Sequence, residues 1–356
     1  MRVVVKIGTS TLTKSGKIDT EYIKGISEEV AGLVRNGKEI VIVSSGAIGF
    51  GAMKSGIKDT RGIVKRQSLA AIGQIILMKE YEKAFSVQGI DIAQILLTYD
   101  VLSNRKSYLN LKNCMEMLLK NKVVPIINEN DVVSIDEIGT AFGDNDVMSA
   151  LVSTKIDADL LIILSDIDGL YDDNPKKNSD ARKIKVVSKI DNEIESYAGK
   201  AGSFFSVGGM KSKIRAASIV MKSGSTMAIA EGREKKVISR IIEGENPGTI
   251  FLPSEKLNAR KRWILAAKPK GKISINECAI EIMKDGKSSL LPVGVVNVEG
   301  NFSQGDVVKI GSFAKGISLL SASEMRKVKG LKSKEASAAL GRKVSEIVRR
   351  DDIVPC

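Results

Sequence analysis

The sequence predicts an α/β protein, in which a three-layer αβα sandwich with a mainly parallel sheet precedes a small β-rich barrel domain. Three observations support this fold class. Short apolar segments alternate with longer mixed segments over the first 255 residues, short strand-like segments with Gly turns follow residue 253, and the charge balance changes in the same region. Regular alternation of this kind is typical of βαβ units built around a parallel sheet.

Six apolar segments of strand length form the predicted sheet. Each is rich in β-branched residues and apolar throughout, as expected for strands that helices cover on both faces. These segments are residues 3–5, 39–43, 92–97, 123–127, 160–164 and 227–230. The helices predicted between them are residues 20–36, 62–87, 105–121, 146–156 and 210–223.

The remainder of the chain predicts a second, smaller domain. The predicted domains are residues 1–257 and 271–356, with a linker at 258–270. The expected strands of the second domain are residues 272–275, 294–299, 305–310 and 316–320, with a helix around 333–340. Residues 256–356 hold 20 Lys+Arg and 10 Asp+Glu, which accounts for +10 of the net +13. Such a basic segment suits either an anionic partner such as nucleic acid or an ordinary solvated surface.

Composition excludes several classes of protein. A chain of 356 residues with 43% hydrophobic and 27% charged residues is typical of a globular protein. Its apolar segments are too short to span a bilayer, and its first residues lack a signal-peptide core, so a cytoplasmic protein is expected. The absence of His excludes Ser-His-Asp catalysis and His-ligated metal. Cys114, Cys278 and Cys356 are widely spaced, and we expect them to be buried small side chains.

Gly-rich polar turns follow the predicted strands. Lys6-Ile-Gly-Thr-Ser10 and Ser44-Ser-Gly46 place N–H groups, hydroxyls and a cation where phosphate ligands bind in α/β proteins. Ser206-Val-Gly-Gly-Met-Lys-Ser-Lys213 leads into a predicted helix, and its glycines and lysines could cradle a polyphosphate. This last segment is not a Walker A motif.

Carboxylate and amide side chains form a second group of candidates. Asn128-Glu-Asn-Asp131 follows a buried strand and offers acceptors for an amino group, which favours a zwitterionic substrate. Asp144, Asn145 and Asp146 open a predicted helix and exceed what an N-cap needs. They could set the geometry of the lysines or hold a hydrated cation. Ser165 and Asp166 follow the strand at 160–164.

In this order and spacing, the motifs resemble those of the glutamate 5-kinases in the amino-acid kinase superfamily. The resemblance rests on residues 6–10, 44–48, 127–131, 143–146, 169–171 and 208–213. Residues 260–263, 288–292 and 300–305 resemble a PUA domain. The resemblance implies ATP-dependent phosphorylation of the L-glutamate γ-carboxylate to γ-glutamyl phosphate, the first step of proline biosynthesis.

The resemblance also assigns roles to residues. It implies that Lys6 and Lys213 are catalytic lysines on the phosphates, and that Asp146 is the aspartate that orients them. The implied substrate-binding residues are Ser45, Asp131 and Asn145. The implied nucleotide-binding residues are Lys6, Ser165, Asp166, Val207, Gly208, Gly209, Met210, Lys211, Ser212 and Lys213. Val207 departs from the family, in which this segment often begins with Thr.

The implied cofactors are ATP and Mg²⁺, with no direct metal ligand assigned to the protein. As partners the resemblance implies L-glutamate, a homo-oligomer, feedback inhibition by proline and handover of the product to glutamyl phosphate reductase, with no membrane. A glutamate carboxylate is ionised at neutral pH, because its ordinary pKa is about 4.3, so a histidine-free kinase needs no general base. The alternative is an RNA-binding PUA protein in which the kinase domain is secondary. Trp263, Phe302 and Phe313 are the only aromatic residues of residues 256–356, a poor stacking platform that favours a structural or regulatory tail.

Overall fold

The computed structural model describes two units of the chain. The described residues are 1–133, 145–175, 177–200, 209–254, 261, 264, 265, 267, 269–284 and 288–355. The units are Met1–Lys256 and Leu257–Cys356, and each has its own hydrophobic core. Most of the predicted linker, residues 258–270, lies outside the described residues.

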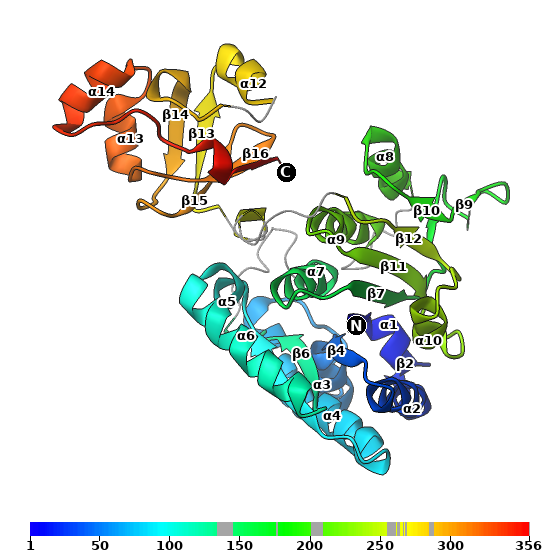
Figure 1. Cartoon of the computed structure of the whole chain (residues 1–356). Coiled ribbons are helices and arrows are strands. Elements are labelled where there is room, and N and C mark those ends of the chain that lie inside the picture. The colour runs from blue at the N-terminus through cyan, green and yellow to red at the C-terminus, as the bar shows by residue number, and fades with distance from the viewer. Residues whose placement is uncertain are drawn as a thin grey trace. The chain divides into compact units, whose positions relative to one another are not determined.

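An eight-stranded, mostly parallel sheet forms the centre of the first unit (Figure 1). Its strand order is β10-β12-β11-β7-β1-β4-β6-β5, and only the β11–β12 pair is antiparallel. The strands are β1 (Arg2–Ile7), β4 (Glu39–Ser44), β5 (Ile92–Leu97), β6 (Val124–Glu129), β7 (Leu160–Ser165), β10 (Val186–Val187), β11 (Thr226–Glu231) and β12 (Thr249–Phe251). All six strands expected from the apolar segments are therefore confirmed.

Helices cover both faces of this sheet (Figure 1). On one face lie α2 (Thr20–Arg35), α3 (Ala47–Ser55), α4 (Ile63–Val87) and α10 (Val237–Ile242). On the other lie α5 (Tyr99–Ser103), α6 (Arg105–Lys120), α7 (Asn145–Lys155) and α9 (Met210–Lys222). The remaining elements of this unit are α1 (Thr9–Leu12), α8 (Asn192–Lys200) and the two-stranded sheets β2 (Thr13–Lys14) with β3 (Lys17–Ile18) and β8 (Leu170–Tyr171) with β9 (Lys183–Ile184). The predicted αβα class is confirmed, although α3 was not expected.

The pleat of β1 decides where Lys6 points. Val3, Val5 and Ile7 belong to the core cluster that the strands form with α2, α4 and α10. Because successive side chains of a strand point to opposite faces, Lys6 lies on the face that α7 covers. Near the carboxyl end of β1, Lys6 thus brings one buried cation to the first turn of α7.

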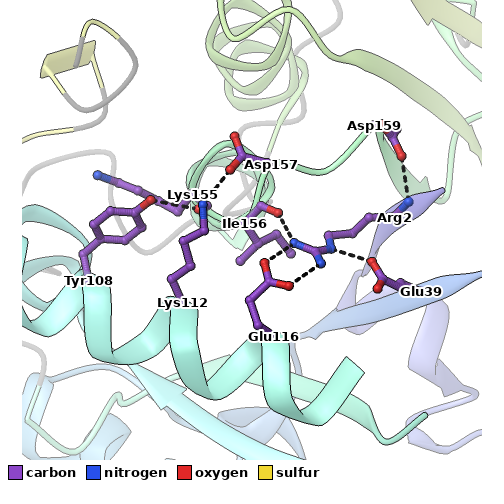
Figure 2. A network of polar contacts seen from close by, with 9 residues as sticks. All are labelled: Arg2, Glu39, Tyr108, Lys112, Glu116, Lys155, Ile156, Asp157 and Asp159. Carbon is purple, nitrogen blue, oxygen red and sulfur yellow. Dashed lines mark hydrogen bonds and ion pairs between the residues drawn. The ribbon is translucent and has the colours of Figure 1, made fainter. Parts of the chain in front are cut away.

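An ion-pair network holds α6 and α7 at the end of the sheet where β1 begins, opposite to the end near Lys6 (Figure 2). Arg2, at the start of β1, pairs with Glu39 on β4 at 2.8 Å and with Glu116 on α6 at 2.8 Å. The same guanidinium donates to the carbonyl of Ile156, directly after α7. The pKa of Arg2 is raised above its ordinary value, chiefly by its hydrogen bond with Glu116. Arg2 on β1 therefore contacts β4, α6 and the residue after α7. These contacts hold the C-terminal end of α7 in place.

The second unit is a small mixed sheet with helices. Its strand order is β14-β13-β15-β16-β17, in which only β13 and β15 are parallel. Its elements are β13 (Gly271–Ile275), α12 (Glu277–Lys284), η1 (Pro292–Gly294), β14 (Val295–Gly300), β15 (Val307–Ile310), β16 (Ala314–Ile317), α13 (Ala322–Val328), α14 (Ser333–Leu340), η2 (Arg350–Asp352) and β17 (Ile353–Pro355). The predicted helix at 333–340 is present, and so is the predicted β-rich second unit.

Two details of the sequence-based prediction were wrong. The strand expected at 316–320 is β16, which ends at Ile317, because the Ser318 hydroxyl turns back to donate to the Leu320 carbonyl at 2.6 Å. Cys114 and Cys278 are exposed rather than buried. Cys114 precedes the buried Met115 on a helix with only a narrow buried face, and Cys278 lies in the first turn of α12. Cys356 lies outside the described residues.

The described helices include no segment with the length and apolarity that a bilayer-spanning helix requires.

Candidate active site

A cavity of about 460 Å³ lies at the carboxyl ends of β1, β4, β6 and β7. This is the edge of a parallel α/β sheet at which ligands bind. Its wall includes all three predicted substrate residues, Ser45, Asp131 and Asn145. The wall also includes four of the predicted nucleotide and catalytic residues, which are Lys6, Ser165, Asp166 and Lys213. Residues from six separate segments thus meet around one space.

Asp146 lies under this cavity and pairs with both lysines. Its Oδ1 lies 2.5 Å from Lys6 Nζ, and its Oδ2 lies 3.0 Å from Lys213 Nζ. The aspartate is fully buried, and Lys6 and Lys213 are only 7% and 5% exposed. Burial by itself raises the pKa of Asp146, but the two ammonium groups outweigh it and hold the pKa below the ordinary value of 3.8. Asp146 therefore lies between the two lysines, which is the arrangement that the first of the two sequence-based alternatives requires.

The phase of α9 separates its two lysines. Lys213 is buried against Asp146, whereas Lys211, two residues earlier, is exposed and does not line the cavity. Two residues correspond to about 200° around a helix, which places them on different sides. The Ser212 hydroxyl lies 3.0 Å from Asp146 Oδ2, so this side chain supports the aspartate. Gly209 and Met210 lie outside the cavity wall as well, and Val207 and Gly208 lie outside the described residues.

Asn145 joins the strand ends to one another. Its Nδ2 donates to the Ser44 carbonyl at 2.8 Å, to Ser45 Oγ at 2.7 Å and to Asn128 Oδ1 at 3.2 Å. Asn145 precedes Asp146 on α7, so one turn of helix supplies an amide to the β4 and β6 side and a carboxylate to the β1 and α9 side. Because the two residues are adjacent, the α7 terminus links the two halves of the cavity.

Several wall residues were not among the predicted site residues. Thr9, Ser10 and Asn128 belong to motifs that the sequence analysis quoted, so a signal was present. The N-terminal residues of α3 also border the cavity, and Gly46 precedes them with a positive φ of 104°. Thr60 and Arg66 carry no motif, since they reach the cavity from the α3–α4 connection and from α4.

The charge distribution defines what the cavity can bind. Two buried ammonium groups share one buried carboxylate, so the cluster of Lys6, Asp146 and Lys213 carries a net positive charge. Such a pair stabilises negative charge that develops on a transferred phosphoryl group. The opposite side offers Ser45, Asn145 and Asp131, which suit a ligand that carries both carboxylate and ammonium groups.

Comparison with known proteins agrees with this geometry. The amino acid kinase family matches residues 1–231, and the PUA domain matches residues 271–340. The chain is 47% identical to the glutamate 5-kinase of Methanosarcina barkeri, over 99% of this chain and 96% of that protein. It is 45% identical to the glutamate 5-kinase of Thermoanaerobacter pseudethanolicus, over 99% and 97% of the two chains.

A solved structure supports the fold. The UMP kinase of Ureaplasma parvum superposes with a TM-score of 0.51 at 16% identity, over 70% of this chain and 98% of that chain. At this identity the likeness concerns the fold alone. The matches over the full length of the chain decide the family. The chain belongs to the glutamate 5-kinases, which are members of the amino acid kinase family, and it carries a PUA domain after its kinase unit.

Proposed function

We propose that this enzyme transfers the ATP γ-phosphoryl group to glutamate by alignment and charge neutralisation through Lys6 and Lys213. ATP-dependent phosphorylation of glutamate follows from its membership of the glutamate 5-kinases. The observation that carries the proposed mechanism is the pairing of both lysines with the buried Asp146, at 2.5 and 3.0 Å. The carboxylate holds the two ammonium groups in place before substrate arrives, so little reorganisation is needed at the transition state.

The two sides of the cavity receive different substrates in this proposal. Ser45, Asn145 and Asp131 bind glutamate, with the Asp131 carboxylate facing the substrate ammonium. Lys6, Ser165, Asp166 and Lys213 lie on the nucleotide side, together with the α9 segment from Val207 onward. The glutamate γ-carboxylate is ionised at neutral pH, since its ordinary pKa is about 4.3, so it attacks phosphorus without a general base.

Mg²⁺ belongs to the same proposal. Within the described ranges, no three Asp, Glu or Cys side chains gather into a group that could hold a metal ion. Mg²⁺ keeps several of its waters and binds substrate phosphates in kinase sites, so in this proposal ATP carries the ion mainly on its phosphate oxygens. When bound, the ion neutralises charge on the phosphates.

Family membership alone supports the remaining parts of the proposal. These are a role in proline biosynthesis, feedback inhibition by proline, a homo-oligomer, handover of the product to glutamyl phosphate reductase and a cytoplasmic location.

An ADP-release assay with hydroxylamine trapping tests the substrate assignment. With ATP, Mg²⁺ and glutamate, we expect ADP release together with γ-glutamyl hydroxamate. Aspartate and acetylglutamate serve as competing acceptors, and we expect neither to be turned over comparably. Turnover of another acceptor without formation of the glutamyl hydroxamate would show that the glutamate site is assigned wrongly.

A further inference from the structure

A chain of hydrogen-bonded amides runs from α4 to the proposed glutamate site. Asn128 Nδ2 donates to Gln74 Oε1 at 2.8 Å, and Asn128 Oδ1 accepts from Asn145 Nδ2 at 3.2 Å. Asn145 in turn donates to Ser45 Oγ at 2.7 Å. Asn128 and Gln74 are 2% and 9% exposed, so the inner part of this row of hydrogen-bonded amides is shielded from water. Gln74 is its innermost member and has no role in the mechanism described above.

Two backbone groups fix the direction of this chain. The amide N–H of Glu129 donates to Asn128 Oδ1 at 2.9 Å, which forces the Asn128 Nδ2 to face Gln74. Gln74 must then accept through Oε1. At the other end, the Ser44 carbonyl accepts from Asn145 Nδ2 at 2.8 Å, which fixes the amide of Asn145 as well. Because a carbonyl can only accept and an N–H can only donate, neither amide can flip without losing a bond.

The substrate end of the chain has a defined polarity as a result. The two hydrogens of Asn145 Nδ2 are shared among three protein acceptors. Its Oδ1 therefore remains the atom that can accept from a substrate ammonium. Ser45 Oγ already accepts from Asn145, so its own proton is available for a substrate carboxylate. At the far end, Gln74 Oε1 accepts from Asn128 Nδ2 and so adds to the hold of the Glu129 N–H on the Asn128 amide.

The other side of the Gln74 amide borders a second cavity. This cavity measures about 530 Å³, and it shares Ala47, Glu129 and Asp131 with the first. Within the described part of the chain, Gln74 Nε2 is buried with no hydrogen-bond partner. A buried amide that leaves one donor unpaired is destabilising, so a hydrophobic side chain would be the more stable choice for packing alone. The acceptor function of Oε1 explains why an amide stands there.

We propose that Gln74 is a positioning residue for glutamate, which together with the Glu129 N–H holds the Asn128 amide in the orientation that accepts from Asn145. This inference rests on the proposed function, because it assumes that Asn145 and Ser45 hold glutamate. Gln74 is not among the described residues that line the first cavity, and its oxygen accepts from Asn128 on the glutamate side, so we expect its effect to concern the amino-acid substrate.

The test compares two substitutions of similar size with a matched control. Gln74→Met keeps the length of the side chain and removes the acceptor, whereas Gln74→Glu keeps an acceptor oxygen. Gln74→Met should raise the glutamate KM roughly tenfold, the value of one hydrogen bond of about 1.4 kcal/mol, and leave the ATP KM unchanged. Gln74→Glu should recover most of this loss. Gln67→Met makes the same replacement on α4 away from both cavities and should leave both KM values unchanged.

A double substitution separates the inference from the function on which it rests. Asn145→Ala should raise the glutamate KM, and adding Gln74→Met to it should produce little further change, because Gln74 acts through Asn145. An unchanged glutamate KM in Asn145→Ala would overturn the proposed glutamate site itself. Additive effects in the double variant, equal changes in both KM values, or Gln74→Glu no better than Gln74→Met would overturn only the role of Gln74.

Discussion

Asp146 is the residue on which the proposed chemistry depends most. It is fully buried, yet it stays charged because Lys6 and Lys213 reach it from the first strand and from α9. A buried carboxylate with two cations leaves the cluster with an excess positive charge, which an incoming phosphate can compensate. The same arrangement makes Asp146 important for stability, since its removal leaves two buried ammonium groups facing each other.

Asp146→Asn should lower the free energy of unfolding by on the order of 3 kcal/mol, and by the same amount at pH 8, 6 and 5. The folded-state pKa of Asp146 lies below its ordinary value of 3.8. The carboxylate therefore contributes its full stability above about pH 3.8, and this stability is lost only as the pH falls through the folded-state pKa. Urea unfolding of both proteins at the three pH values measures the difference. A difference that shrinks between pH 8 and pH 5 would mean that burial, rather than the lysines, dominates the pKa.

Lys213→Ala should lower kcat a few hundredfold with little change in the ATP KM. Its ammonium group is expected to interact most strongly with charge that develops in the transition state, and losing one such group costs roughly 3–4 kcal/mol. Lys211→Ala is the matched control, since Lys211 is exposed on the same helix and lies outside the cavity wall. It should act mildly and mainly on nucleotide binding.

Steady-state kinetics of both variants at saturating glutamate decide between the two lysines. An inactive Lys211→Ala beside a nearly normal Lys213→Ala would show that the phase of α9 does not determine which lysine reaches the phosphates.

The motifs of the sequence contain the residues of the ionic cluster and three members of the amide chain, Ser45, Asn128 and Asn145, but not Gln74. Lys6, Asp146 and Lys213 stand in motifs at strand ends and helix starts, where parallel strands must converge. Gln74 lies inside a long helix and carries no such signal. Its role depends on the distance to Asn128, which only the packing of α4 against the sheet determines.

At the scale of elements, α3 and α4 cross at glycine contacts beside the glutamate side of the cavity. A Cβ on Gly73 would lie 1.8 Å from the Ala47 carbonyl oxygen and 2.4 Å from the Gly51 nitrogen. A Cβ on Gly51 would lie 1.9 Å from the Leu69 carbonyl oxygen. The backbones therefore touch, and this contact fixes α4, which carries Gln74, against the turn that carries Ser45.

Gly73→Ala should destabilise the protein by about 1–3 kcal/mol and raise the glutamate KM, because the added methyl group forces the two helices apart. Gly32→Ala is the control, since Gly32 also lies within a helix but a methyl group added there would meet nothing within 4 Å. That substitution should stabilise by about 0.5–1 kcal/mol through lower backbone entropy in the unfolded state. Equal effects of the two substitutions on stability and KM would contradict the role of the crossing.

The elements that sequence analysis predicted are those with a strong local pattern. Apolar β-branched segments gave the six main strands, and amphipathic segments gave five long helices. Helix α3 was not predicted, because it contains two glycines, which disfavour a helix in isolation. Its sequence is Ala47-Ile-Gly-Phe-Gly-Ala-Met-Lys-Ser55. The close crossing with α4 requires a small residue at Gly51, so tertiary packing overrides local propensity there.

At the scale of the whole molecule, each of the two units has its own hydrophobic core. Among the described residues, the core cluster that the strands form with α2, α4 and α10 extends to Ile250, and the larger core cluster of the second unit begins at Ile273. In the second unit, Phe302 is 4% exposed, and Phe313 is partly buried and packs against the core. Both rings therefore contribute to packing. The described residues that line the cavity at the carboxyl ends of β1, β4, β6 and β7 all belong to the first unit.

A fragment of residues 1–257 should fold and retain phosphotransfer to glutamate without the PUA domain. It keeps all eight strands of the large sheet, the hydrophobic core and every cavity residue, from Lys6 to Lys213. A fragment that ends at Gly248 is the control, because it lacks β12, which lies between β10 and β11, and its sheet should fail to form. Circular dichroism reports folding, and the hydroxamate assay reports activity. A 1–257 fragment that is folded but inactive would mean that the PUA domain contributes to the site or to an assembly that catalysis requires.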